Sequence, residues 1–286
     1  MTSATSLEDR DGVTWLTLHR PERDNTLDGV MLDGIEEGLA QARRETGVLV
    51  LRGLPEVFCT GADLSLVAGP NSEYDHAPER VYQLWTEMIE SDVIIVCHVR
   101  GRASAGGVGL AAAADIVVAD MTAAFALPEM LFGLMPAMVL PFLARRVGWH
   151  RAHFMTLSTR AIDVETAAAW GLVDVYDARS EVALGRLLAR LRRVPRDAVT
   201  AYKTYAAQAA EVESYRELAV AANRSRFADS RVRARISAFT SRGLMPWEVE
   251  DAGAGPCSRT ERERDLAAQL AHRPGSGAMG TIGGQA

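Results

Sequence analysis

The order of short apolar runs and amphipathic stretches along residues 1–120 is the feature that most limits the fold. Runs typical of buried strands occur at 13–18 (VTWLTL), 48–51, 93–99 and 115–119. Between them, residues 27–46 and 80–90 carry apolar side chains at helical spacing. Strands that alternate with helices are typical of α/β folds whose strands pair in parallel. We therefore predict an α/β fold for this part of the chain.

The second half of the chain has a different pattern. Beyond Pro136 the spacing of apolar residues is almost wholly helical, apart from a short strand that we predict at 172–175. After Glu250 the chain is rich in Gly, Ala, Ser and Arg, and residues 273–286 show no apolar periodicity. Such a composition buries too little apolar surface to fold, so we expect a disordered tail at 251–286.

Charge and cysteine content limit the partners and the compartment. The 286 residues carry a net charge of −6 with no block of like charges, whereas a nucleic-acid-binding protein usually presents a basic face. The N-terminal residues lack the basic and apolar regions of a signal peptide, and no apolar run is long enough to span a bilayer. The three cysteines, Cys59, Cys97 and Cys257, show no paired spacing. We expect a cytoplasmic protein with reduced thiols and with neither nucleic acid nor membrane as a partner.

Two glycine-containing turns each follow a predicted strand. They are Thr60-Gly61-Ala62-Asp63 and Ala105-Gly106-Gly107, and the second opens a predicted helix. Glycine lets the backbone approach a ligand closely, and the first N–H groups of a helix have no partner within it. Two such donors aimed at one carbonyl oxygen form an oxyanion hole. The alternative is that both segments are simply tight strand-to-helix turns.

The second turn overlaps a motif of another class. Residues 107–112 (GVGLAA) fit the dinucleotide-binding pattern GxGxxA, and Glu129 follows at roughly the distance of its ribose-binding acid. In that pattern the acidic residue ends the next strand, whereas here the next strand ends at Asp120. The motif also does not lie in the first strand–helix unit of the chain. We therefore expect no nicotinamide cofactor.

Glu129 lies in an apolar segment, FALPEMLFG at 125–133. Burial of a carboxylate among apolar side chains raises its pKa and suits it to general acid/base catalysis. The alternative is a helix-capping or solvent-facing glutamate after Pro128. His150 and His153 share a predicted helix face but have no third ligand nearby, so we predict no metal site.

Several ordered motifs give the chain, over about residues 10–250, a resemblance to the enoyl-CoA hydratase/isomerase (crotonase) superfamily. They are His19–Thr26 (HRPERDNT), Phe58–Asp63 (FCTGAD), Gly101–Gly109, Ala114–Ile116 and Phe125–Pro136 (FALPEMLFGLMP). The resemblance implies a spiral of ββα units followed by helices that build a homotrimer or a dimer of trimers. We accordingly expect a spiral core at 1–195 and a helical trimerisation region at 196–250.

The resemblance also implies functional residues. By position, Ala62 and Gly106 supply the oxyanion-hole N–H groups, and Glu129 matches one of the two glutamates of family hydratases. The second glutamate falls on Gly109, which we expect to leave room for a branched substrate. The further candidate substrate-binding residues are Asp63, Gly107, Gly109, Arg80, Arg100 and Arg102, with the arginines as candidates for binding a distal carboxylate.

A narrower resemblance is to the enoyl-CoA hydratase homologues of polyketide β-branching cassettes. It is carried by Gly53–Cys59, His98–Gly101, Ala105–Gly109, Leu131–Leu134, Val139–Leu143 and Pro246–Glu248. It implies a dehydratase that converts 3-hydroxy-3-methylglutaryl on an acyl carrier protein to 3-methylglutaconyl. The substrate is carried on the phosphopantetheine of that protein or as a CoA thioester, and no other cofactor is expected. The alternatives are an enoyl-CoA or methylglutaconyl-CoA hydratase, the decarboxylase of the same cassette, and a non-catalytic homologue that binds acyl carrier protein.

Overall fold

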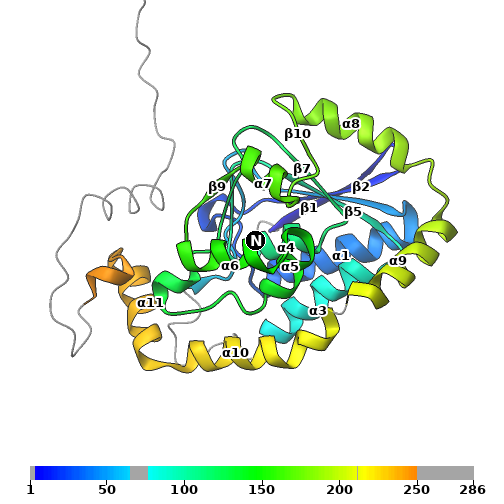
Figure 1. The fold of residues 1–286 in the computed structure, drawn as a ribbon. Coiled ribbons are helices and arrows are strands. Elements are labelled where there is room, and N and C mark those ends of the chain that lie inside the picture. Colours follow the sequence, from blue (N-terminus) through cyan, green and yellow to red (C-terminus); the bar gives the residue numbers. More distant parts are fainter. Residues whose placement is uncertain (1–3, 65–76, 211, 250–286) are drawn as a thin grey trace, which may run out of the picture. The chain divides into compact units, whose positions relative to one another are not determined.

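The computed structural model describes residues 4–64, 77–210 and 212–249 (Figure 1). All the described residues belong to one compact unit, which ends at Val249. The tail expected at 251–286 lies outside the described residues. Within this unit, two sheets are surrounded by helices, as the predicted α/β class requires. The two-sheet arrangement also agrees with the expected spiral of ββα units.

The larger sheet has six strands in the order β1-β2-β3-β5-β7-β10. Their bounds are β1 Thr5–Arg10, β2 Val13–Leu18, β3 Val48–Arg52, β5 Ile94–Val99, β7 Ile116–Ala119 and β10 Val175–Tyr176. From β2 onward neighbouring strands are parallel, and only β1 pairs in the antiparallel sense. The four strands predicted in the first half are confirmed within a few residues. The strand predicted at 172–175 is displaced, because Leu172 and Val173 pack in the core ahead of β10.

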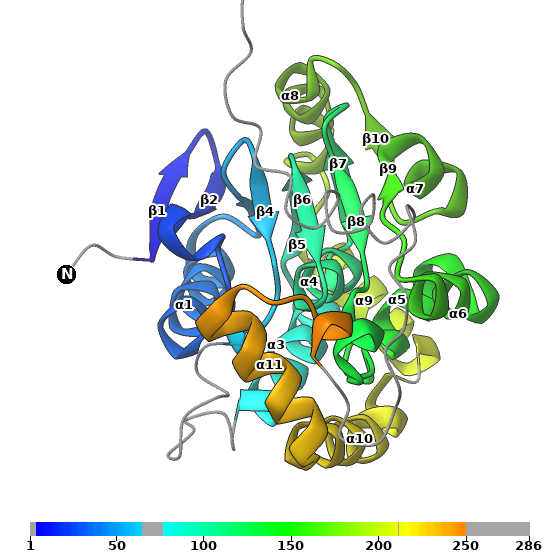
Figure 2. The ribbon, with the colours of Figure 1, turned by 90° about the vertical axis from the view of Figure 1, so that its left-hand side faces the viewer.

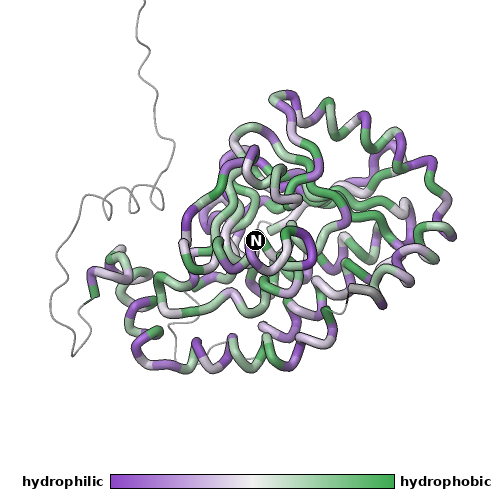
Figure 3. The backbone as a smooth tube through the Cα atoms, in the orientation of Figure 1, coloured by the Kyte–Doolittle hydropathy of each residue, from purple (hydrophilic) through white to green (hydrophobic). Residues whose placement is uncertain are grey.

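Both faces of the larger sheet are buried, because residues of β3 alternate between two apolar clusters. Val48 and Val50 face Leu184 and Leu188 of helix α8 (Ser180–Leu191). Leu49 and Leu51 join the main core with the helices of the opposite face. Figure 3 shows the central strands as mainly hydrophobic, whereas hydrophilic and hydrophobic residues alternate along α8.

The smaller sheet has four strands of two or three residues, in the order β4-β6-β8-β9. They are β4 Val57–Cys59, β6 Arg102–Ser104, β8 Ala124–Ala126 and β9 Ile162–Asp163. The first three lie side by side and parallel (Figure 2), and each follows a strand of the larger sheet after a short turn. This sheet was not predicted from the sequence. Its strands end where both glycine turns begin.

Among the described residues of the first half, three α-helices lie between strands. They are α1 Gly29–Glu45, α3 Ala77–Glu90 and α4 Gly106–Ala113. The Asp28 side chain caps α1 by accepting a 3.0 Å hydrogen bond from the Met31 N–H. Helix α4 is apolar on all sides and packs between α3 and α5 (Leu140–Val147), so its N-terminus is held inside the protein.

The second half is mainly helical, as predicted. After α5 come α6 Trp149–Ser158, α7 Val164–Trp170, α8, α9 Arg196–Ala210, α10 Arg216–Ala228 and α11 Ser230–Arg242. Helix α10 packs against α3, and α11 packs against the 3-10 helix η3 (Glu129–Phe132). The C-terminal helices therefore return to the spiral and meet the segment that carries Glu129. No helix within 4–64, 77–210 and 212–249 has the length and apolar character needed to cross a bilayer.

Candidate active site

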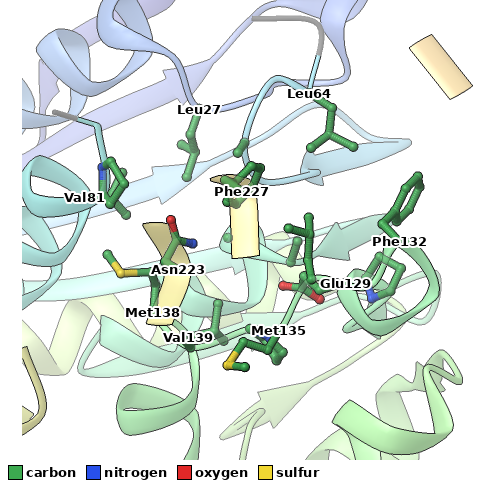
Figure 4. A pocket seen from close by; sticks show the side chains of 18 of the residues that line it. Leu27, Leu64, Val81, Glu129, Phe132, Met135, Met138, Val139, Asn223 and Phe227 are labelled. Atoms are coloured by element: carbon green, nitrogen blue, oxygen red, sulfur yellow. The ribbon is translucent and has the colours of Figure 1, made fainter. Parts of the chain in front are cut away.

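An apolar pocket of about 140 Å³ lies where both glycine turns, η3, α3 and α10 meet (Figure 4). Its lining comprises Leu27, Thr60, Ala62, Leu64, Pro78, Val81, Trp85, Ala105, Gly106, Pro128, Glu129, Phe132, Leu134, Met135, Pro136, Ala137, Met138, Val139, Asn223 and Phe227. Three of the sequence-predicted site residues are thus brought together: Ala62, Gly106 and Glu129. The only ionisable side chain among these lining residues is Glu129.

The first glycine turn follows β4 and leaves the N–H of Ala62 available. Leu27 N–H donates to the Gly61 carbonyl oxygen at 2.7 Å, and Leu27 pairs with Ala62 in an isolated parallel bridge. In this bridge the Ala62 N–H donates to no described residue. Gly61 has φ +85°, a conformation that glycine adopts without the strain of a side chain.

The second turn places the N-terminus of α4 against the first. Ala105 N–H donates to the Ala126 carbonyl oxygen of β8 at 3.0 Å, and Gly106 then begins α4 with an N–H that donates to no described residue. A Cβ built on Gly61 would lie 2.7 Å from Gly106 N, and one built on Gly106 would lie 3.8 Å from Ala62 N. The two N–H groups are therefore close neighbours at the pocket wall, as an oxyanion hole requires.

Glu129 is held at the pocket by the short helix η3, which begins after Pro128. The residue is only partly covered, but its Oε2 atom is fully buried and has no hydrogen-bond partner in the described protein. Burial in the apolar pocket raises the pKa of Glu129 to about 7, and its own backbone N–H offsets a small part of this rise. A carboxyl with this pKa is divided between its acid and base forms at neutral pH, which suits it to proton transfer.

Gly107 and Gly109, the other two glycines in the first turns of α4, allow neighbouring segments to pack closely. A Cβ on Gly107 would lie 2.0 Å from the Cys59 carbonyl oxygen, so this glycine lets α4 approach β4. A Cβ on Gly109 would lie 2.2 Å from Cη2 of Trp85. The expectation that Gly109 leaves room for a branched substrate is therefore wrong, because the indole of Trp85 occupies that space.

Asp63 and the three arginines lie outside the pocket lining. Asp63 pairs with Arg23 at 2.7 Å. Arg80 pairs with Glu36 and Asp33 of α1, Arg100 contacts the Gly53 carbonyl oxygen and Glu181, and Arg102 lies 3.1 Å from Asp24. Each arginine therefore forms an ion pair with an acidic residue of the protein and lies outside the pocket lining. None of the three is placed to bind the distal carboxylate of the expected substrate.

Sequence reasoning missed two polar residues of the pocket, Trp85 and Asn223. Both lie on helices whose periodicity marks them as core positions, and neither belongs to a recognisable motif. A weak signal existed for Asn223, because an amide on the apolar face of a predicted helix needs a hydrogen-bond partner.

Two linked sheets with helices between their strands, and a pocket at the junction of two strand-to-helix turns, define a crotonase-type fold. Residues 8–249 match the family model described as enoyl-CoA hydratase/isomerase. The chain belongs to this family of enzymes.

Within this family, the chain is similar to several individual proteins. The bacillaene synthase dehydratase PksH of Bacillus subtilis (strain 168) is 40% identical over 241 residues, which cover 82% of this chain and 93% of that protein. The 2,3-dehydroadipyl-CoA hydratase of Escherichia coli (strain K12) is 34% identical over 206 residues, covering 70% of this chain and 80% of the relative. The solved structure of a polyketide-biosynthesis enoyl-CoA hydratase, PksH, from Bacillus subtilis superposes with a TM-score of 0.80 at 37% identity. That superposition covers 86% of this chain and all of the other.

Proposed function

We propose that this chain is a hydro-lyase that removes water from a 3-hydroxy-3-methylglutaryl thioester on an acyl carrier protein, giving the 3-methylglutaconyl thioester. The observation that carries the proposal is the pairing of one buried carboxyl, Glu129, with two available backbone donors in a single apolar pocket. The similarity to a polyketide synthase dehydratase over most of both chains supports the choice of substrate.

The proposed reaction uses these three groups in turn. The thioester oxygen accepts hydrogen bonds from the N–H groups of Ala62 and Gly106. The Glu129 carboxylate takes the α-proton, and the electrons of that C–H bond form an enolate that the two donors stabilise. The bond between the β-carbon and the hydroxyl oxygen then breaks as the carbon–carbon double bond forms. Glu129 returns the proton to the departing hydroxyl, so that water leaves and the carboxylate is regenerated.

One carboxyl is sufficient for this sequence because it holds the proton only between two steps. An ordinary glutamate at neutral pH would be a weak base and almost never protonated. Burial brings the pKa of Glu129 to about 7, so that accepting and returning the proton are both accessible near neutral pH.

The proposal also covers the protein that delivers the substrate and the oligomeric state of the enzyme. We infer that an acyl carrier protein delivers the substrate on its phosphopantetheine arm and that the chain acts as a homotrimer or a dimer of trimers. Tyr202 and Tyr205 of α9 and Leu218 of α10 are each more than two-thirds exposed. They support the assembly because the cores of subunit interfaces are rich in aromatic and apolar side chains.

Mass spectrometry of the carrier-bound substrate tests the function. Purified enzyme should convert 3-hydroxy-3-methylglutaryl carrier protein to a species lighter by one water, and faster than the matching CoA thioester. The similarity to a 2,3-dehydroadipyl-CoA hydratase makes CoA-linked hydration the second candidate, which faster turnover of CoA-linked substrates would favour. Loss of carbon dioxide from 3-methylglutaconyl carrier protein, supplied as a separate substrate, would indicate the decarboxylase. If neither substrate changes, only the binding homologue remains.

A further inference from the structure

Two buried polar atoms of residues that line the pocket have no hydrogen-bond partner among the described residues and no part in the mechanism above. Besides Glu129, the lining contains three polar side chains: Thr60, Trp85 and Asn223. Thr60 Oγ1 donates to the Asp24 carbonyl oxygen at 3.0 Å. Trp85 Nε1 and Asn223 Oδ1 are buried and form no hydrogen bond with the described protein. An unsatisfied buried polar atom loses the hydrogen bonds that it would form with water, so its presence calls for an explanation.

The indole of Trp85 is fixed in position by the residues around it. The side chain is 1% exposed on α3. Its ring packs edge-on against Phe142, with centroids 5.4 Å apart, and it fills the space that Gly109 leaves open. A ring enclosed in this way cannot turn its N–H toward water. Because Trp85 lines the pocket, a group that enters the pocket can supply the acceptor that this N–H lacks among the described residues.

Asn223 approaches the same pocket from a distant part of the sequence. It is 8% exposed on α10, which packs against α3, and its amide points into the cavity between Met138 and Phe227 (Figure 4). An amide carbonyl oxygen only accepts hydrogen bonds, and an indole N–H only donates. Apart from the oxyanion-hole N–H groups and Glu129, the described lining thus offers one unused donor, Trp85 Nε1, and one unused acceptor, Asn223 Oδ1.

We propose that Trp85 and Asn223 form a neutral subsite that binds the hydroxyl group of the acyl chain. A hydroxyl can accept from the Trp85 N–H and donate to Asn223 Oδ1 at the same time. A carboxylate only accepts, and its burial calls for a cation, which no residue of the described pocket lining supplies. The inference rests on the proposed function, because it requires the thioester to lie in the oxyanion hole so that the acyl chain points toward this subsite.

Ligand binding tests the subsite separately from turnover. Three pantetheine thioesters are titrated calorimetrically: 3-hydroxy-3-methylbutyryl, with a hydroxyl only; 3-methylglutaryl, with a carboxylate only; and 3-methylbutyryl, with neither. Glu129→Gln protein is used so that the hydroxylated ligand stays intact. We expect the hydroxyl to improve Kd about tenfold over 3-methylbutyryl. Asn223→Leu and Trp85→Phe, each added to Glu129→Gln, should reduce this advantage to less than about threefold.

The control is the 3-methylbutyryl ligand, which has neither a hydroxyl nor a carboxylate. Its Kd should be nearly the same in all three proteins, which separates loss of hydrogen bonding from general damage to the pocket. Equal weakening of every ligand, or a hydroxyl advantage that survives both substitutions, would overturn the subsite. An advantage that belongs to the carboxylate ligand instead would overturn its assignment to the hydroxyl. If Trp85→Phe lowers the melting temperature so far that binding cannot be measured, Asn223→Leu alone tests the subsite. Failure of the wild type to release water would contradict the proposed function and leave these binding results valid.

Discussion

At the scale of single residues, the site depends on a carboxyl whose Oε2 atom is buried in an apolar pocket. Glu129 gains no ion pair that would keep it charged, and its Oε2 atom lacks a hydrogen-bond partner among the described residues. The charged form is therefore disfavoured, which is the direct cause of the raised pKa. The apolar neighbours of Glu129 indicated this burial, while the local sequence left a helix-capping or solvent-facing glutamate as the alternative.

The pH dependence of dehydration should report this carboxyl. Because burial raises the pKa of Glu129 from 4.5 to about 7, the carboxylate that takes the α-proton becomes the major form only above that pH. We expect kcat/KM to rise about tenfold per pH unit below pH 7 and to level off above it, since kcat/KM follows the free enzyme. A rate that stays level from pH 8 down to pH 5 would show that another group takes the proton.

Gly109 should tolerate no side chain, because the Trp85 indole fills the space next to it. Its Cβ would collide with the Trp85 indole, and overpacking of a buried site costs about 1–3 kcal/mol. Gly109→Ala should therefore lower Tm. Gly185→Ala is the matched control: Gly185 lies in the middle of α8 with open space around its Cα, so alanine there should raise stability by about 1 kcal/mol. Equal melting temperatures for wild type and Gly109→Ala would mean that Trp85 is not fixed against this glycine.

At the scale of elements, prediction from the sequence was limited by strand length. Strands β2, β3, β5 and β7 of the larger sheet each have at least three buried residues in a row, and the apolar pattern predicted them. Strand β1 is mostly exposed and was not predicted, and β10 has only two residues. Strands β4, β6 and β8 have three residues each, which is too short for any periodicity to appear. Yet these strands position the turns at Gly61 and Gly106. The hole was predicted from glycines and resemblance, while the sheet that supports it was not.

Gly61→Ala should damage the hole much more than it damages the fold. The new Cβ would lie 2.7 Å from Gly106 N, in the path of the donor. Loss of one oxyanion-hole donor reduces kcat by roughly 10²–10³. Gly243→Ala provides the control, because Gly243 also has positive φ but has nothing within 4 Å of its added Cβ. Both variants should lose about 1 kcal/mol of stability to backbone strain, but only Gly61→Ala should lose activity. Similar kcat values for the two variants would rule out the assignment of the hole.

At the scale of the whole molecule, the chain brings distant segments together in a way that no local pattern encodes. The sequence predicted that 196–250 is helical, and α9, α10 and α11 confirm it. It did not predict that α10 returns to α3 and places Asn223 and Phe227 in the pocket, because that contact depends on long-range packing. The arginine candidates failed for the same reason: their ion-pair partners are distant in sequence, such as Glu36 for Arg80.

Sedimentation velocity tests the proposed assembly. At micromolar concentration the protein should sediment with three or six times the mass of its 31.0 kDa chain. Tyr205→Glu, which places a charge on the exposed apolar surface of α9, should shift the protein toward monomer. Val182→Glu on α8, outside the region expected to trimerise, should leave the assembly intact. A monomeric wild type would refute the assembly.

The role of Glu129 is tested most directly by its replacement with glutamine, which keeps the volume of the side chain but cannot carry the proton. Mass spectrometry of 3-hydroxy-3-methylglutaryl carrier protein would follow water loss by wild type, by Glu129→Gln and by Glu37→Gln. Glu37 lies on the exposed surface of α1 and serves as the control. We predict that Glu129→Gln lowers kcat by at least about 10²-fold with little change in KM, because the proton transfer occurs only on the way to the transition state. Near-normal water loss by Glu129→Gln would contradict the account, because the proton would then be moved by another group.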